Sequence, residues 1–168
     1  MKKVILLFLT SLFLLSCADN NRFNKENIIP TPKEFTIQDN KLYPIKEVVN
    51  SEKRDNLKFP HNNDEYYLKS SKGHVVIEGN EVWAKQTLSQ LTNESGCIPD
   101  VEIHDWSAYP IRGFMHDTGR NYQTLEMLKE TIDLMSLYKI NYFHWHLTDY
   151  PAWRIECKIF PQLNDAQY

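Results

Sequence analysis

Hydrophobic and polar residues follow clear periods in several separate stretches of the chain. EYYLKS and HVVIEG are short β-rich runs separated by Ser-Lys-Gly, a pattern that predicts two strands joined by a tight turn. In EVWAKQTLSQL, residues 81–91, Ala84, Leu88 and Leu91 recur at spacings of four and three. This spacing predicts a helix with one apolar stripe against a sheet. With a further short strand expected at residues 101–104, these elements predict a small α+β domain of the order β-β-α-β.

The pattern changes after residue 110, where a second unit begins. IRGFMH, residues 111–116, predicts a strand, and residues 141–147 predict another. Between them, residues 124–138 have the spacing of an amphipathic helix, and Thr124 can serve as its N-cap. The apolar stripe of this helix consists of Leu125, Leu128, Ile132 and Met135. A strand, a helix and a second strand in this order form a βαβ unit, whose two strands are expected to be parallel.

Two stretches before residue 65 give weaker signals. IIPTPKEF, residues 28–35, contains two prolines, which favour an extended segment over a helix. Residues 39–64 are charged and have few periodic apolar positions, so we leave their secondary structure unassigned.

The N-terminus has the pattern of an export signal. Lys2 and Lys3 precede VILLFLTSLFLL, an apolar run shorter than the ~20 residues of a membrane-spanning helix. The run ends in LLSC, which resembles the lipobox of bacterial lipoproteins, with Cys17 as the lipidated residue. The alternative is an ordinary signal peptide cleaved elsewhere. We expect residues 1–16 to be a lipoprotein signal peptide and residues 17–27 a tether. The chain is then an exported lipoprotein of the cell envelope, in the periplasm or at the outer membrane, attached to the membrane through its lipid anchor.

Composition and charge narrow the class further. The chain is 42% hydrophobic and 24% charged, which is typical of a soluble globular protein. Its net charge is −3 at pH 7 and it has no basic cluster, which argues against a nucleic-acid partner. Cys97 and Cys157 fall in different predicted domains, so we expect two unpaired or buried cysteines.

The strand at residues 141–147 carries the candidate chemistry. Because side chains alternate along a strand, one face holds Tyr142, His144 and His146, and the other holds Phe143, Trp145 and Leu147. We expect the apolar face to pack under the preceding helix, which leaves the polar face toward the other side of the sheet. The strand leads into Thr148 and Asp149, at the carboxyl end where ligands collect in α/β folds.

Three interpretations of this strand stay open on the residues alone. His144 and His146 can bind a transition metal, although no further ligands of the usual kind stand nearby. They can also be buried histidines with hydrogen bonds to neighbours. The third interpretation is a carbohydrate site. Aromatic faces stack on sugars, while carboxylates and guanidinium groups bind hydroxyls, and the window contains Trp145, Trp153, Asp149 and Arg154.

A family resemblance favours the third interpretation. RGFMHDTGR, residues 112–120, then the predicted helix, then LYKINYFHWHLTDYPAWRIE, residues 137–156, resembles the opening of the catalytic barrel in glycoside hydrolase family 20, the β-N-acetylhexosaminidases. NIIPTPKEF and QTLSQL resemble landmarks of that family's small N-terminal α+β domain. The HWHLTD string is the most specific part of the resemblance. Residues 36–64 show none.

The resemblance implies a fold and a reaction. The expected fold class is α/β, with an α+β accessory domain at residues 28–107 and the first two strands of a (β/α)8 TIM barrel at residues 108–168, the barrel being incomplete. The implied reaction removes terminal N-acetylhexosamine from glycans by substrate-assisted retaining hydrolysis, in which the substrate's own acetamido oxygen attacks the anomeric carbon. The resemblance implies no cofactor and no metal.

The resemblance also implies roles for individual residues. Arg112 matches the arginine that holds hydroxyls of the terminal sugar, and Asp149 matches the acidic residue at the end of the second strand, near that sugar. Arg112 can instead be a structural ion-pair former, since it lies early in its strand rather than at the carboxyl end. Three further residues fall on family motif positions as supporting or scaffold residues: Asp117, His146 and Trp153.

The Asp-Glu pair that performs the chemistry in the family is expected on a later strand. Asp64-Glu65 is the one such step here, and it falls in the predicted accessory domain, so it is not a candidate. We therefore expect no catalytic pair in this chain and no hexosaminidase activity by the chain alone. A complete barrel takes about 250 residues. An open two-stranded piece of it is expected to be poorly stable and prone to aggregation.

Two other functions remain as alternatives. One is a surface lipoprotein that binds amino sugars without cleaving them. The less favoured one is a metal-dependent barrel hydrolase that uses the His-x-His pair.

Overall fold

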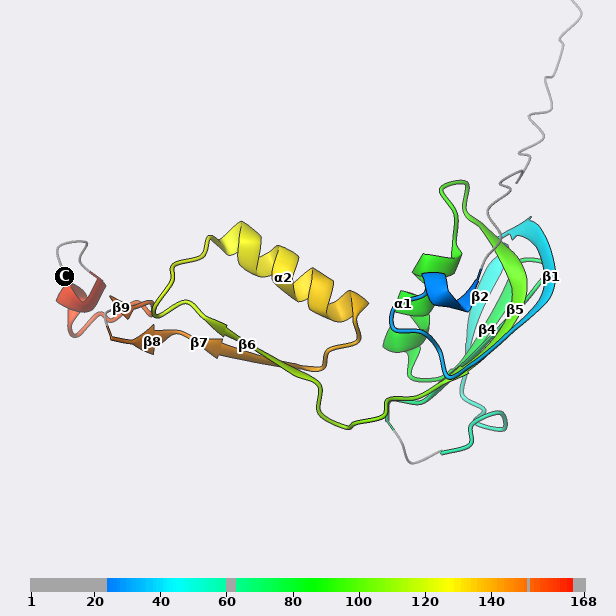
Figure 1. The fold of residues 1–168 in the computed structure, drawn as a ribbon, viewed down its shortest axis with the longest axis horizontal. Helices are drawn as coiled ribbons and strands as arrows, with labels where there is room; N and C mark the ends of the chain where they lie inside the picture. Colours follow the sequence, from blue (N-terminus) through cyan, green and yellow to red (C-terminus); the bar gives the residue numbers. More distant parts are fainter. Residues whose placement is uncertain (1–23, 60–62, 151, 165–168) are drawn as a thin grey trace, which may run out of the picture.

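The computed structural model describes residues 24–59, 63–150 and 152–164 (Figure 1). The predicted signal peptide, Cys17 and most of the predicted tether lie outside these residues. The molecule is elongated, with a sheet and a helix at one end and a second helix over a strand pair at the other (Figure 1). Within the three described ranges, no helix is both long and apolar enough to cross a membrane.

The accessory domain is built on a mixed five-stranded sheet of order β1-β5-β3-β4-β2. Neighbouring strands are antiparallel, except that β4 and β2 are parallel. The strands are β1 (Glu34–Pro44), β2 (Glu47–Ser51), β3 (Tyr66–Ser71), β4 (His74–Gly79) and β5 (Cys97–Asp105). Helix α1 (Glu81–Leu91) packs against the sheet, and the short 3-10 helix η1 (Lys25–Asn27) precedes β1.

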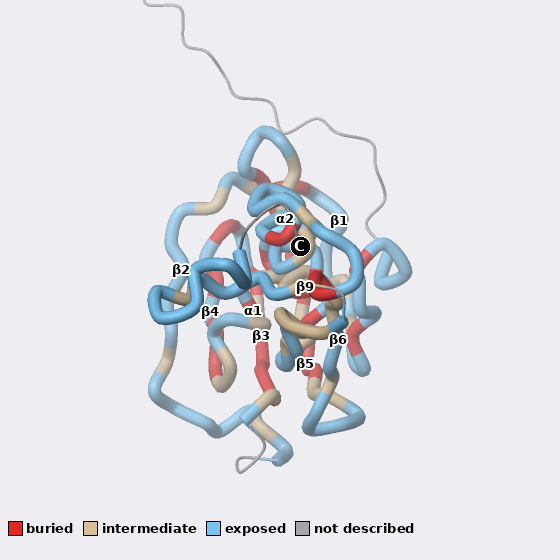
Figure 2. Tube along the Cα trace, turned by 90° about the vertical axis from the view of Figure 1, so that its left-hand side faces the viewer, coloured by how far each residue is buried: buried red, intermediate tan, exposed pale blue. Residues whose placement is uncertain are grey.

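The hydrophobic core of this domain lies between α1 and the sheet. The predicted stripe of α1 is confirmed, because Ala84, Leu88 and Leu91 are all buried in one cluster. Leu68 of β3 and Ile103 of β5 belong to the same cluster and are fully buried. Figure 2 shows buried residues concentrated in the strands of this sheet. Each such side chain contributes about 1.5–3 kcal/mol through its burial, so the stability of the described chain resides mainly here.

The predicted order β-β-α-β is confirmed for β3, β4, α1 and β5, and two further strands that we did not predict, β1 and β2, precede it. The register of β1 against β5 shifts between Ile37 and Asp39 and again between Asp39 and Leu42. These irregularities interrupt the alternation that identifies a strand in a sequence. Strand β2 lies at the sheet edge with mostly exposed residues, so it has no buried face to reveal it. The last strand also begins earlier than predicted, at Cys97 instead of Val101.

The second unit is the predicted βαβ unit. Strands β6 (Gly113–Asp117) and β7 (Tyr142–His146) are parallel, and α2 (Leu125–Leu137) connects them. Thr124 is the N-cap of α2, as predicted: its hydroxyl accepts a hydrogen bond from the backbone N–H of Met127 at 3.3 Å. The predicted domain boundary falls in the segment between β5 and β6. Two-residue strands β8 (Thr148–Asp149) and β9 (Ala152–Trp153) then form an antiparallel pair, followed by the 3-10 helix η2 (Pro161–Asn164).

The predicted stripe of α2 is only half buried. Leu128 and Met135 are buried, whereas Leu125 is 57% and Ile132 46% exposed. Helix α2 lies over β6 and β7 (Figure 1), and a two-stranded sheet is too narrow to cover a whole helical face. The apolar surface of α2 therefore extends beyond the sheet it packs on.

The predicted alternation along β7 is confirmed by its ring contacts. The rings of His144 and His146 lie 6.1 Å apart, and those of Phe143 and Trp145 lie 6.3 Å apart. Residues two apart therefore share a face, as a regular strand requires.

The two cysteines among the described residues differ in state. Cys157 has a free thiol, as expected. Cys97 is buried, as the expectation of unpaired or buried cysteines allows, but it is disulfide-bonded rather than unpaired. A single sequence does not reveal which cysteines pair.

Candidate functional site

Four polar side chains gather where β6 and β7 end. Asp117 is the last residue of β6 and pairs in register with His146, the last residue of β7. Asp149 follows three positions later in β8, and Arg120 lies in the loop after β6. The carboxyl ends of parallel strands meet at one edge of a sheet, and this is the edge where α/β folds bind ligands.

Arg120 joins the two carboxylates of this cluster. One guanidinium nitrogen donates to Asp117 Oδ2 and another donates to Asp149 Oδ2, each at 2.5 Å. The backbone N–H of Arg120 also donates to Asp117 Oδ1 at 3.0 Å. The Arg120 side chain is 58% exposed and that of Asp149 is 31% exposed, so both can be reached from solvent.

His146, at the end of β7, is the fourth member of the cluster and contacts Asp149. Its Nε2 lies 3.1 Å from Asp149 Oδ2, within hydrogen-bond distance. The backbone N–H of Tyr150 donates to Asp149 Oδ1 at 2.7 Å. These two contacts and the Arg120 charge hold the pKa of Asp149 below its usual value, with the Tyr150 N–H as the largest cause. The N–H and the guanidinium of Arg120 lower the pKa of Asp117 in the same way.

The loop after β6 is pressed against β8. The backbone N–H groups of Thr118 and Gly119 both donate to the carbonyl oxygen of His146, at 3.0 and 3.2 Å. A Cβ atom at Gly119 would lie 3.0 Å from the backbone nitrogen of Asp149, closer than ordinary contacts allow. Glycine at this position therefore permits the approach that brings Arg120 to Asp149.

Aromatic residues flank the cluster. The indole N–H of Trp145 donates to Thr118 Oγ1 at 2.9 Å, so this ring supports the loop. Arg154 donates to the carbonyl oxygen of Thr118 at 2.9 Å, and its guanidinium lies 5.5 Å from the centre of the Tyr122 ring. Trp153 stands on β9 beside β8 and is 39% exposed, which leaves indole surface available to a ligand.

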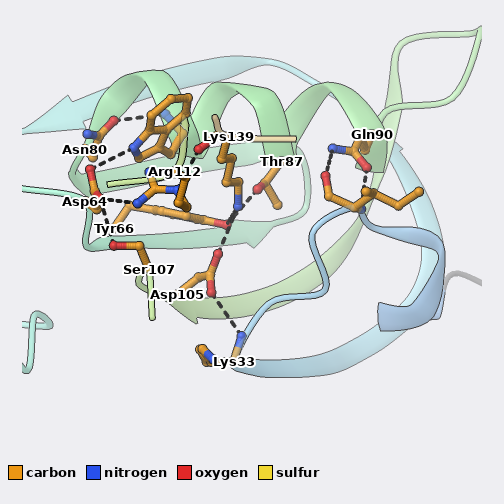
Figure 3. A network of polar contacts seen from close by, with 12 residues as sticks. Lys33, Asp64, Tyr66, Asn80, Thr87, Gln90, Asp105, Ser107, Arg112 and Lys139 are labelled. Atoms are coloured by element: carbon orange, nitrogen blue, oxygen red, sulfur yellow. Dashed lines mark hydrogen bonds and ion pairs between the residues drawn. The ribbon is translucent and has the colours of Figure 1, made fainter. Parts of the chain in front are cut away.

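Arg112 does not join this cluster. It directly precedes β6, whereas the cluster lies at the other end of the strand, about 17 Å away along the backbone for five residues at about 3.3 Å each. Its guanidinium donates to Asp64 Oδ2 at 2.7 Å and to the carbonyl oxygens of Lys139 and Tyr109 (Figure 3). The structure therefore favours the ion-pair alternative for Arg112, and the arginine beside Asp149 is Arg120.

Sequence reasoning named three of the four clustered residues and missed Arg120. The signal was present, because Arg120 closes the RGFMHDTGR motif and falls just after the predicted strand. The rule that ligands bind at the carboxyl ends of strands points to Arg120 rather than Arg112.

Asp64 and Glu65 have structural contacts in the accessory domain. Asp64 accepts hydrogen bonds from Arg112, Ser107 and Trp83. Glu65 is buried, and its carboxylate binds His104 at 2.5 Å and the backbone N–H groups of residues 58 and 59. Both carboxylates lie outside the strand-end cluster.

The metal interpretation of His144 and His146 requires further ligands close to the two imidazole rings. Among the described residues, no group of three or more His, Cys, Asp or Glu side chains is arranged to hold a metal ion.

Comparisons with known proteins agree with this geometry. Residues 109–167 match the model of glycosyl hydrolase family 20, catalytic domain. A β-hexosaminidase of Porphyromonas gingivalis is 42% identical over 115 residues, which cover 60% of this chain and 15% of the relative. The β-hexosaminidase A of Caenorhabditis briggsae is 30% identical over 160 residues, covering 90% of this chain and 29% of the relative.

A solved structure is similar over both parts of the fold. The crystal structure of a β-N-acetylhexosaminidase from Bacteroides fragilis superposes with a TM-score of 0.67 and 26% sequence identity. The match covers 82% of this chain and 36% of that chain. The chain thus spans well under half the length of each of these relatives.

The fold and these matches define a chain that resembles part of a family of glycosidases, with an α+β domain joined to a unit that is similar to part of their catalytic domain. Within residues 109–167, the strands β6 and β7 and the helix α2 match the catalytic domain of glycosyl hydrolase family 20.

Proposed function

We propose that this chain forms part of the sugar-binding wall of a β-N-acetylhexosaminidase that removes terminal N-acetylhexosamine from glycans. Arg120 and Asp149 are the groups that bind hydroxyls of the terminal sugar. Asp117 and His146 hold these two groups in place, and Trp153 offers an indole face to the ring.

One observation carries this proposal: Arg120 and Asp149 are paired at an exposed strand end within the part that matches the family. A sugar hydroxyl both donates and accepts, so an adjacent guanidinium and carboxylate can bind it from both sides. The partners of Arg120 and Asp149 fix their positions before a ligand arrives, which lowers the cost of ordering them on binding.

We further propose that the chain alone does not hydrolyse its substrate. The substrate-assisted route needs an Asp to orient the acetamido group and a Glu to act as acid and base. Asp64 and Glu65, the one sequential pair, are held by other contacts away from the proposed sugar.

The experiment combines a turnover assay with a binding measurement. The purified chain is incubated with a chromogenic N-acetylglucosaminide, and we expect no release of the chromophore. Calorimetry with N-acetylglucosamine should show weak binding, which Arg120→Gln and Asp149→Asn each reduce by about tenfold or more through loss of a charged hydrogen bond. Lys129→Gln, on the outer side of α2, is the control and should leave binding unchanged.

Each half of the proposal can fail separately. Turnover by the purified chain would show that the missing-pair argument is wrong. Binding that is insensitive to Arg120→Gln and Asp149→Asn would show that the sugar binds elsewhere. Binding of N-acetylglucosamine at this site, by a chain that is the whole functional protein and has no catalytic strands to pair with, would favour the alternative of a surface lipoprotein that binds amino sugars without cleaving them.

Membrane attachment through Cys17 is a separate proposal, supported by the LLSC pattern alone.

A further inference from the structure

Two cations of the βαβ unit reach into the accessory domain. Arg112, just before β6, pairs with Asp64, and Lys139, between α2 and β7, pairs with Asp105 at 2.9 Å (Figure 3). Each pair joins a residue of one domain to a residue of the other. Gln86 of α1 adds a third link, donating to the hydroxyl of Ser136 on α2 at 2.7 Å.

Lys139 is the more deeply buried of the two cations, at 7% exposed. Its ammonium group also donates to the hydroxyl of Tyr66 at 2.9 Å and lies 4.7 Å from the centre of that ring. Burial lowers the pKa of Lys139, and the charge of Asp105 opposes this effect. A buried ammonium group without such partners is strongly unfavourable, so these contacts are what keep Lys139 in place.

The backbone conformation of Lys139 is a second, independent observation that the contacts of its side chain contribute to the structure. Its φ is +55°, the left-handed conformation that ends many helices and that glycine adopts most easily. The N–H groups of Lys139 and Ile140 close this helix end by donating to the carbonyl oxygens of Ser136 and Met135, each at 2.9 Å. Lysine is conformationally less favourable here than glycine, and the contacts with Asp105 and Tyr66 offset that cost.

The two pairs meet at the beginnings of β6 and β7. The guanidinium of Arg112 donates to the carbonyl oxygen of Lys139 at 2.8 Å, which connects one ion pair to the other. The backbone N–H of Arg112 donates to the side chain of Asn141 at 2.9 Å, and the N–H of Tyr142 donates to the carbonyl oxygen of Arg112 at 3.2 Å. The starts of both strands are therefore tied to the accessory domain.

We propose that Arg112 and Lys139 are positioning residues, through which Asp64 and Asp105 of the accessory domain fix the orientation and pairing of β6 and β7. The accessory domain then holds the beginnings of β6 and β7 in place, and Arg120 and Asp149 lie just beyond the other ends of these two strands. The part of this proposal that concerns the sugar site rests on the proposed function. The coupling between the domains does not.

The experiment compares variants of the full chain by amide hydrogen exchange and by amide NMR shifts. Asp64→Asn and Lys139→Gly each remove one coupling contact. Lys139→Gly also relieves the left-handed backbone, so a purely local role at the helix end predicts that it stabilises α2. Coupling predicts the opposite for the strands: exchange in β6 and β7 becomes about tenfold faster or more, since breaking a buried ion pair is strongly destabilising.

A second readout follows the distant strand ends. Because β6 and β7 transmit the change, the amide shifts of Arg120 and Asp149 should move in both variants, whereas exchange in the central strands β3 and β5 stays within about twofold of the wild-type rate. Glu102→Gln is the matched control. It removes the exposed pair with Lys69, at 3.3 Å, from the same strand as Asp105, and should leave β6 and β7 unchanged.

The proposal is overturned if exchange in β6 and β7 responds no more to Asp64→Asn and Lys139→Gly than to Glu102→Gln. These readouts require no sugar, so a chain that fails to bind N-acetylglucosamine can still confirm or refute the coupling.

Discussion

At the scale of single residues, the site depends on one arginine shared by two carboxylates. Sequence reasoning placed Asp117, His146 and Asp149 correctly at the strand ends, because strand alternation and the end of β7 follow from local pattern. It selected Arg112 over Arg120, although the rule that ligands bind at the carboxyl ends of strands points to Arg120. The close approach of Gly119 to Asp149 is a tertiary contact that no local pattern encodes. The role of Trp153 stays a prediction.

Arg120→Gln tests the electrostatics of this cluster. The folded pKa values of Asp117 and Asp149 lie below the ordinary 3.8. Their pairing therefore stabilises the fold above about pH 4, and the stabilisation is lost as the pH falls through the folded pKa. Removing the guanidinium should raise both pKa values toward 3.8, while the backbone N–H of residue 120 and of Tyr150 keep part of the shift. Carboxyl NMR titration measures this, and unchanged pKa values would contradict the Arg120 bridge.

Gly119→Ala tests the close approach itself. The added methyl group would lie 3.0 Å from the backbone nitrogen of Asp149, a tight contact that separates the loop and β8 by a few tenths of an ångström. We expect the pKa of Asp149 to rise as in Arg120→Gln, because the guanidinium is displaced from it. The same titration measures the effect, and Gly96→Ala, whose Cβ would meet nothing within 4 Å, is the control for an exposed glycine turn.

At the scale of elements, both helices follow directly from the sequence and two edge strands do not. Regular apolar spacing predicts both α1 and α2, and the N-cap residue Thr124 adds a signal for the start of α2. Strand β1 gives no clear pattern because register shifts interrupt its alternation. Strand β2 gives none because most of its residues are exposed, so it has no apolar face. The burial of the α2 stripe was also beyond local reasoning, since it depends on how many strands lie beneath the helix.

Two leucines separate the contributions of the elements to stability. Leu68 of β3 is fully buried in the accessory core, whereas Leu134 of α2 is 56% exposed. Leu68→Ala should lower the free energy of unfolding by about 2–5 kcal/mol. Leu134→Ala should lower it by less than about 1 kcal/mol, because little apolar area is lost from the interior. Chemical denaturation of both variants measures this, and equal losses would contradict the difference in burial between Leu68 and Leu134.

Helix α2 should promote self-association of the chain. Leu125 and Ile132 form one exposed apolar ridge, and Met127 and Leu134 form another on the opposite flank. Replacing one residue of each ridge, Ile132→Glu with Leu134→Lys, should lower the average mass in sedimentation without lowering the unfolding temperature. Asp133→Lys, on the polar side of the same helix, is the control, and an equal effect of this change would point to charge rather than apolar contact.

At the scale of the whole molecule, the chain joins a well-packed accessory domain to the opening of a catalytic domain. The family resemblance in the sequence identified both parts, and the structural match to a β-N-acetylhexosaminidase covers both. What sequence could not predict is how they are joined, because the contacts of Arg112 and Lys139 connect residues far apart in the chain.

The measurement that tests the account most directly is an NMR titration of the isotope-labelled chain with N-acetylglucosamine, followed at every assigned amide. The account predicts that shifts concentrate at residues 117–120 and 146–150, where β6 and β7 end, and that Arg120→Gln raises the sugar concentration needed for them by about tenfold or more. Shifts centred on the accessory sheet, or shifts at the strand ends that occur at the same sugar concentration in Arg120→Gln, would contradict it.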